Sequence, residues 1–218
     1  MVATINATPI NITIFDGFNP APEDGNTNFN SVNTQEWDLE AFFYDNATNE
    51  LSMVSGFNAF GTHQEDIMIG DIFIDLNRNS TWDYVIDLNQ GTNKLANDSY
   101  SIVDLAVGNP QFADLQEPYD ASADRWGYDH SDALPYALIS GGQVIGGGTF
   151  SYSSYKDFQG THYTLGAIDM SFLAGEEYFV HQTYSCGNDL LVGNVTEPTI
   201  IIMLGLGLLS VAFFHRKK

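Results

Sequence analysis

Three carboxylates at alternate positions are the residues whose types and spacing best suit catalysis. Glu36, Asp38 and Glu40 stand two residues apart, so on a β-strand all three project from one face. Neighbouring carboxylates perturb one another's pKa values, which is what a catalytic acid and nucleophile require. The alternative is a strand with a polar, cation-associated face, because this spacing also arises by chance in an acidic chain.

The Glu-x-Asp-x-Glu spacing resembles the catalytic strand of laminarinase-like glycoside hydrolases, which are also jelly rolls. The resemblance implies a retaining mechanism in which Glu36 is the nucleophile, Glu40 the acid/base and Asp38 the residue that tunes both. It covers only this short motif. We therefore favour no catalytic residue and keep a laminarinase-like glycoside hydrolase as the alternative function.

A second set of oxygen ligands follows at every second position between residues 75 and 83. The candidate calcium ligands are Asp75, Asn77, Asn79, Asp83 and the carbonyl of Thr81. Oxygen atoms that converge from alternate residues of a tight loop suit this hard cation, although Ser80 and Ile86 replace the glycine and the glutamate of the usual calcium loop. The alternative is an Asn-rich β-hairpin turn in which these side chains cap main-chain groups.

Other catalytic classes find no support in the sequence. The five histidines are His63, His130, His162, His181 and His215. They form no i, i+4 pair and no His-Glu-x-x-His run, which argues against zinc hydrolase chemistry, and we expect most of them at the surface or in loops. Gly-x-Ser-x-Gly is absent, and the single cysteine, Cys186, cannot form an intrachain disulfide.

The charge is distributed unevenly. All 28 acidic residues precede residue 200, together with only four of the seven Lys and Arg residues. Such an acidic body repels phosphate backbones, so we expect no nucleic-acid partner, and it favours divalent or cationic partners. Acidity also keeps an exported protein soluble.

Short apolar or alternating runs separated by Asn, Asp, Gly and Ser clusters predict an all-β fold. The expected strands are 12–15, 36–44, 51–57, 71–75, 82–88, 99–107, 137–139, 149–155, 161–169 and 178–184. We expect one short helical turn at 171–176, an irregular loop at 109–135, and a hairpin or a closely approached strand where glycines flank 143–145. This pattern favours a β-sandwich of jelly-roll type.

The C-terminal end predicts one transmembrane helix. Residues 200–214 are apolar and uncharged, and they are followed by His215 and the basic Arg216, Lys217 and Lys218. Fifteen residues are short against the roughly 20 that a membrane span needs, but snorkelling basic side chains extend the segment. The positive-inside rule places the basic tip in the cytoplasm and the acidic body on the other side of the membrane.

The tail resembles a bacterial PEP-CTERM sorting signal, which has a Val-Pro-Glu-Pro segment, a Gly- and Leu-rich helix and a basic end. The matching residues are Val195, Thr196, Glu197 and Pro198, the apolar run, and Arg216, Lys217 and Lys218. The resemblance implies recognition and cleavage near Pro198 by an exosortase, with release to the cell surface or matrix. Thr196 stands where the family has its first proline.

The body also resembles uncharacterised exosortase-dependent surface proteins, in residues 35–40, 70–75 and 186–189. We therefore expect an acidic β-domain at 1–193, a sorting motif and linker at 194–199, a membrane helix at 200–214 and a cytoplasmic tip at 215–218. The first fifteen residues lack the basic and apolar regions of a signal peptide, so we expect a leader upstream or a misassigned start.

These observations favour a non-enzymatic, membrane-tethered protein of the cell surface or extracellular matrix. Its expected partners are an exosortase-like processing protease, the membrane and exopolysaccharide. Aromatic residues in or near loops, Tyr152 and Tyr155 among them, are candidates for stacking on sugar rings, and core positions are the alternative. Calcium is the one cofactor that the sequence suggests.

Overall fold

The computed structural model describes residues 8–18, 21–22, 39–56, 58–59, 68–79, 81–88, 98–113, 135–157, 160–185 and 189–196. These residues form an all-β fold, as predicted, and one 3₁₀ turn, η3 (Ser171–Leu173), lies within the expected helical turn. Within these ranges there is no helix long and apolar enough to cross a membrane. The predicted membrane helix at 200–214 and the tip at 215–218 lie outside the described residues.

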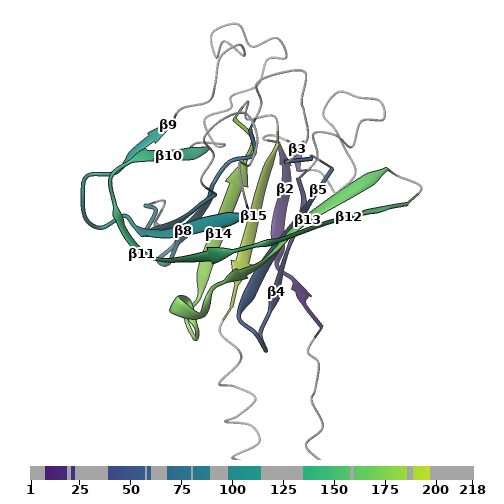
Figure 1. Cartoon of the computed structure of the whole chain (residues 1–218), viewed down its shortest axis with the longest axis horizontal. Helices are drawn as coiled ribbons and strands as arrows, with labels where there is room; N and C mark the ends of the chain where they lie inside the picture. The colour runs from purple at the N-terminus through teal and green to yellow at the C-terminus, as the bar shows by residue number, and fades with distance from the viewer. Residues whose placement is uncertain are drawn as a thin grey trace, which may run out of the picture.

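Two antiparallel sheets pack against each other (Figure 1). The five-stranded sheet has the order β1 (Ile10–Asn11), β4 (Leu39–Asp45), β5 (Glu50–Ser55), β13 (Thr161–Asp169), β12 (Ser151–Lys156). The eight-stranded sheet has the order β11 (Gln143–Thr149), β8 (Ser99–Asp104), β7 (Tyr84–Asp87), β6 (Ile72–Asp75), β14 (Tyr178–Thr183), β15 (Leu190–Val195), β2 (Thr13–Phe18), β3 (Ala21–Pro22). A separate pair consists of β9 (Gln111–Ala113) and β10 (Ala137–Ser140).

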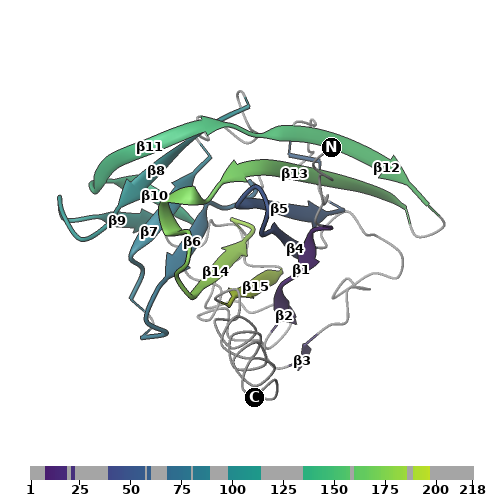
Figure 2. The same ribbon diagram turned by 90° about the horizontal axis from the view of Figure 1, so that it is seen from below.

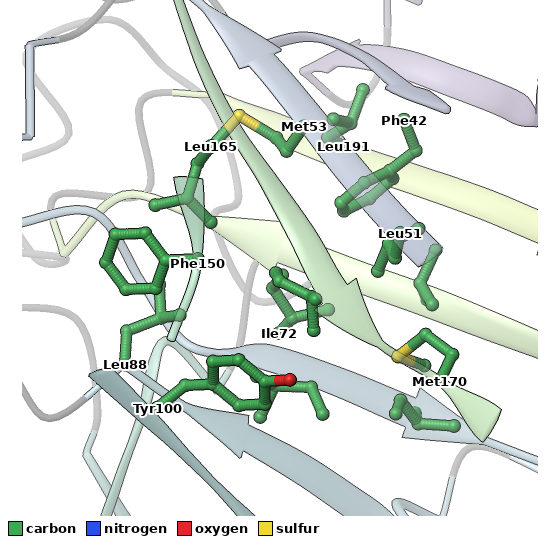
Figure 3. Packing of buried hydrophobic residues seen from close by; sticks show 14 of the residues in the cluster. Phe42, Leu51, Met53, Ile72, Leu88, Tyr100, Phe150, Leu165, Met170 and Leu191 are labelled. Atoms are coloured by element: carbon green, nitrogen blue, oxygen red, sulfur yellow. The ribbon is translucent and has the colours of Figure 1, made fainter. Parts of the chain in front are cut away.

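The main hydrophobic core fills the space between the two large sheets (Figure 3). Phe42 and Leu51 from the five-stranded sheet meet Ile72 and Leu191 from the eight-stranded sheet, and all four are fully buried. Side chains alternate between the faces of a strand, so Phe73 points away from this core. It joins a second cluster on the opposite face of the eight-stranded sheet, which is covered by residues of β9 and β10.

Strands β1, β3, β9 and β15 lie outside the predicted strands. β9 lies within the stretch expected to be an irregular loop, and β11 spans the glycine-flanked segment that was expected to be a hairpin or a closely approached strand. β15 runs to Val195, two residues beyond the expected domain boundary at 193. Gly193 reads as a strand breaker, yet a Cβ there would lie 2.7 Å from the Val180 side chain and 3.1 Å from Phe42, so the packing of the strand requires a glycine.

Candidate functional site

A β-bulge positions Glu40, the one candidate catalytic carboxylate within the described residues. The pairing of β4 with β5 shifts between Leu39 and Ala41, which makes Glu40 the extra residue. Leu39 and Phe42 are three positions apart, and the bulge allows both to be fully buried in the core. Glu40 is thereby turned to the outer face of the five-stranded sheet. Glu36 and Asp38 lie outside the described residues.

On that outer face Glu40 meets a histidine that holds a second carboxylate. Leu165 of β13 faces the core, so His162, three positions earlier, faces outward. His162 Nδ1 lies 2.6 Å from Glu40 Oε1, and His162 Nε2 lies 2.9 Å from Asp157 Oδ1. We call these three residues the His162 clasp. It joins β4 to the β12–β13 hairpin across the intervening β5.

Tyr155 covers the His162 clasp on its solvent side. It stands directly opposite His162 in the β12–β13 register, and the two rings stack with centroids 4.5 Å apart and an interplanar angle of 7°. Tyr155 is 52% exposed, whereas His162 is 3% exposed. One face of the phenol ring therefore packs on the imidazole, and the residue remains open to solvent.

The clasp favours a charged imidazole. Burial alone would lower the pKa of His162, but hydrogen bonds to Asp157 and Glu40 and the charges of these two carboxylates outweigh burial and raise the pKa above its usual value. A neutral imidazole carries one N–H, so it can donate to only one of the two carboxylates, whereas imidazolium can donate to both. The complete clasp is thus a proton-dependent contact.

The candidate calcium loop forms the turn of the β6–β7 hairpin. Asp75 Oδ1 accepts the main-chain N–H of Asn77 at 2.9 Å and that of Asn79 at 3.4 Å. Asp83 Oδ2 accepts the N–H of Leu76 at 2.8 Å. The carboxylates therefore cap the turn, as the hairpin alternative expects.

The other candidate ligands of this loop are exposed. Asn77, Asn79 and Thr81 are exposed, and the Asn79 side chain accepts the Thr81 N–H at 2.8 Å. Across the described ranges, no group of three or more His, Cys, Asp and Glu side chains is placed to hold a metal ion. Arg78, in the same loop, forms an ion pair with Glu177, and its guanidinium carbon lies 4.2 Å from the centroid of the Phe179 ring.

The segment predicted to be a sorting signal begins inside the sheet. Val195 is buried and pairs with Tyr178 of β14, and Thr196 is the last described residue and is exposed. Glu197, Pro198, Arg216, Lys217 and Lys218 lie outside the described residues.

Sequence reasoning missed the His162 clasp. The expectation that the histidines lie at the surface or in loops is wrong for His162 and His181, which are both buried in strands; His63, His130 and His215 are outside the described residues. The only available signal was the hairpin formed by 149–155 and 161–169, which brings Tyr155 close to His162. The contact with Glu40 depends on a bulge two strands away.

No protein-family model, no curated protein and no solved structure matches this chain.

Proposed function

We propose that this chain is an exported, membrane-tethered surface or extracellular-matrix protein. In this proposal a PEP-CTERM-like tail is recognised by an exosortase-like protease, and a β-sandwich of jelly-roll type binds or packs with exopolysaccharide without cleaving it. The uncharged run at 200–214, the basic end and the acidic body support this topology.

The main support for a protein that does not cleave the polysaccharide is the hydrogen bond between His162 Nδ1 and Glu40 Oε1. The acid/base of a retaining glycosidase must carry a proton when the leaving group departs. Glu40 instead lies beside an imidazole whose raised pKa favours the imidazolium ion, and an imidazolium is best matched by an ionised carboxylate. This arrangement supports a structural role for Glu40.

The outer face beside the clasp is the proposed saccharide-binding surface. The Tyr155 ring offers an exposed aromatic surface against which a sugar ring can stack. The side chain of Asp157 is 36% exposed next to it and can accept hydrogen bonds from sugar hydroxyls. An acidic chain repels polyanions, so neutral or amino-sugar polymers fit this surface best.

Membrane tethering and processing are tested by intact mass spectrometry of the membrane, surface and medium fractions of the native host. A form truncated near Pro198 at the surface or in the medium supports sorting, and full-length protein in the membrane alone supports a simple tail anchor. Protein found only in the cytosol contradicts the proposal.

Saccharide binding is tested on a glycan array with the full-length protein in a mild detergent. Tyr155→Ala is expected to lower binding about 5- to 30-fold, because stacking on an aromatic ring contributes about 1–2 kcal/mol. Ser153→Ala on the same strand is the matched control. Background signal for the wild type, or equal binding by both variants, argues against this surface.

The competing proposal is a glycoside hydrolase that uses Glu36 and Glu40. It requires release of reducing ends from a β-glucan or a related polymer and loss of that activity in Glu36→Gln. Wild-type protein that releases no reducing ends from a broad polysaccharide panel removes it.

A further inference from the structure

The two large sheets have very unequal edges. On one side they end in β1 and β3, strands of two residues each, and β3 includes Pro22, which has no N–H to donate. On the other side they end in β11 and β12, with seven and six residues. Short edge strands and proline are devices that prevent edge-to-edge association. Only the first side uses them.

β11 and β12 form one continuous edge. A single residue, Phe150, separates them, and its N–H donates to the Asp98 carbonyl at 2.8 Å where the chain passes from one sheet to the other. Figure 2 shows the two strands following each other along one margin of the molecule. Within the described part of the chain, no strand pairs with the second side of either strand.

This edge is uncharged along almost its whole length. From Gln143 to Tyr155 there is no charged residue, although the chain has 28 acidic residues, and Lys156 ends the segment. Every residue of β11 is exposed, including Val144 at 66% and Ile145 at 47%. A register shift between Val144 and Gly146 interrupts β11, so β12 is the more regular template for a further strand.

We propose that this edge, centred on β12, pairs in antiparallel fashion with the same edge of a second copy of the chain. Two acidic chains repel each other over most of their surfaces, but the uncharged edge allows strands to approach without opposing carboxylates. A strand pairs antiparallel with its own copy about a twofold axis, so a closed dimer that uses β12 of both copies leaves no further β12 edge for a third chain.

The size of the edge sets the expected affinity. The six residues of β12 at about 3.3 Å each give a paired edge about 20 Å long and one strand wide. An interface of that shape lies at the small end of specific interfaces, so the dimer is weak and depends on concentration. Tethering to a common surface would raise the effective concentration. The proposal itself does not depend on the tail.

The test compares the full-length chain with two lysine variants in a mild detergent. Detergent-corrected light scattering and sedimentation give the mass as a function of concentration, and hydrogen exchange reports on the β12 amides. Wild type is expected to shift from monomer to dimer with rising concentration, with slower exchange in β12. Ser153→Lys, which places like charges at the paired edges, is expected to remain monomeric, and Thr48→Lys in the exposed β4–β5 turn is expected to dimerise like wild type.

An isosteric variant covers the case in which Ser153→Lys fails to fold. Ser153→Cys in a Cys186→Ser background is expected to form a crosslinked dimer with a short bismaleimide, while Thr48→Cys is not. Wild type that is monomeric at every concentration overturns the proposal. A dimer that persists in Ser153→Lys also overturns the proposal, because detergent or the apolar tail then causes the association. A different protein bound along β12 overturns it as well.

Discussion

Asp71, beside the eight-stranded sheet, and the His162 clasp, on the five-stranded sheet, rely on different hydrogen-bond donors. The Asp71 carboxylate accepts two main-chain N–H groups. Its Oδ1 lies 3.0 Å from the Leu88 nitrogen and its Oδ2 lies 2.8 Å from the Leu138 nitrogen. On the outer face of the five-stranded sheet, Glu40 and Asp157 accept from the ring of His162, and Asp157 Oδ1 also accepts the Gly160 N–H at 3.3 Å. A main-chain N–H keeps its proton at every physiological pH, whereas an imidazole does not.

The difference predicts opposite responses to pH. Main-chain capping also occurs at Asp169, at the end of β13 in the five-stranded sheet. Hydrogen bonds from the Ser171 hydroxyl and N–H lower the pKa of Asp169, so its contribution is present above its ordinary pKa and is lost as the pH falls through the lowered value. His162 has a raised pKa. The contribution of the His162 clasp is complete below the ordinary value of about 6.5 and is lost as the pH rises through the folded value.

The largest expected effect comes from removing a buried carboxylate that holds two strands. Asp71→Ala leaves the N–H groups of Leu88 and Leu138 without this acceptor, and each such loss costs about 1–3 kcal/mol. We expect the free energy of unfolding to fall by about 2–4 kcal/mol, measured by urea unfolding at pH 7. Asp98→Ala, at an exposed position, is the control. Equal stability of the two variants would contradict the role of Asp71.

Breaking the His162 clasp should have the next largest effect. His162→Gln removes the donor that holds Glu40 and Asp157, and hydrogen bonds to charged groups contribute about 1.5–3 kcal/mol. Because Asp157 is partly exposed, we expect a loss of about 1–2 kcal/mol at pH 5.5. Glu40→Gln should act on the same contact, so the double variant should lose less than the two single losses combined. Strict additivity would show that the residues do not act together.

A substitution in the β6–β7 turn should have a smaller effect on stability. It also distinguishes a hairpin turn capped by carboxylates from a calcium loop. Asp75→Ala removes the acceptor for Asn77 and Asn79, so we expect a loss of about 1–2 kcal/mol both in EGTA and in calcium. Thermal unfolding in the two buffers measures it. If the variant loses stability only when calcium is present, the ion is the principal partner of Asp75 and the turn is a calcium site.

The smallest expected change is the effect of pH on the His162→Gln variant. The difference in melting temperature between wild type and His162→Gln should be largest near pH 5.5 and should shrink as the pH rises past the folded pKa of His162. Thermal unfolding at several pH values measures the difference. A gap that widens toward alkaline pH would reverse the sign of the proposed linkage.

Much of the fold follows from local patterns. β6 is a short run that is buried at every position, β4 and β13 each place apolar side chains in the core, and turn residues separate the strands. β15 was missed because Gly193 and Asn194 interrupt its apolar run. The reason for Gly193 is the close approach of Val180 from the neighbouring strand and of Phe42 from the other sheet, and such tertiary contacts leave no local signal.

The candidate site was less predictable than the fold. The spacing in the β6–β7 turn was visible because its hydrogen bonds join residues two to seven positions apart. The His162 clasp joins residues 122 positions apart through a bulge at Glu40. Neither the register of β4 with β5 nor its irregularity can be read from residue types, because they depend on packing Leu39 and Phe42 into one core.

The protonation states of His162 and Glu40 decide whether Glu40 belongs to a charged clasp or is free to act as a catalytic acid. Nuclear magnetic resonance of the full-length chain with ¹⁵N-labelled histidine, with His162→Gln for assignment, measures the protonation of both ring nitrogens directly. The account predicts that at pH 6 His162 is an imidazolium whose two N–H protons exchange slowly with solvent. A neutral His162 at that pH, with one unprotonated nitrogen facing a protonated Glu40, would contradict it.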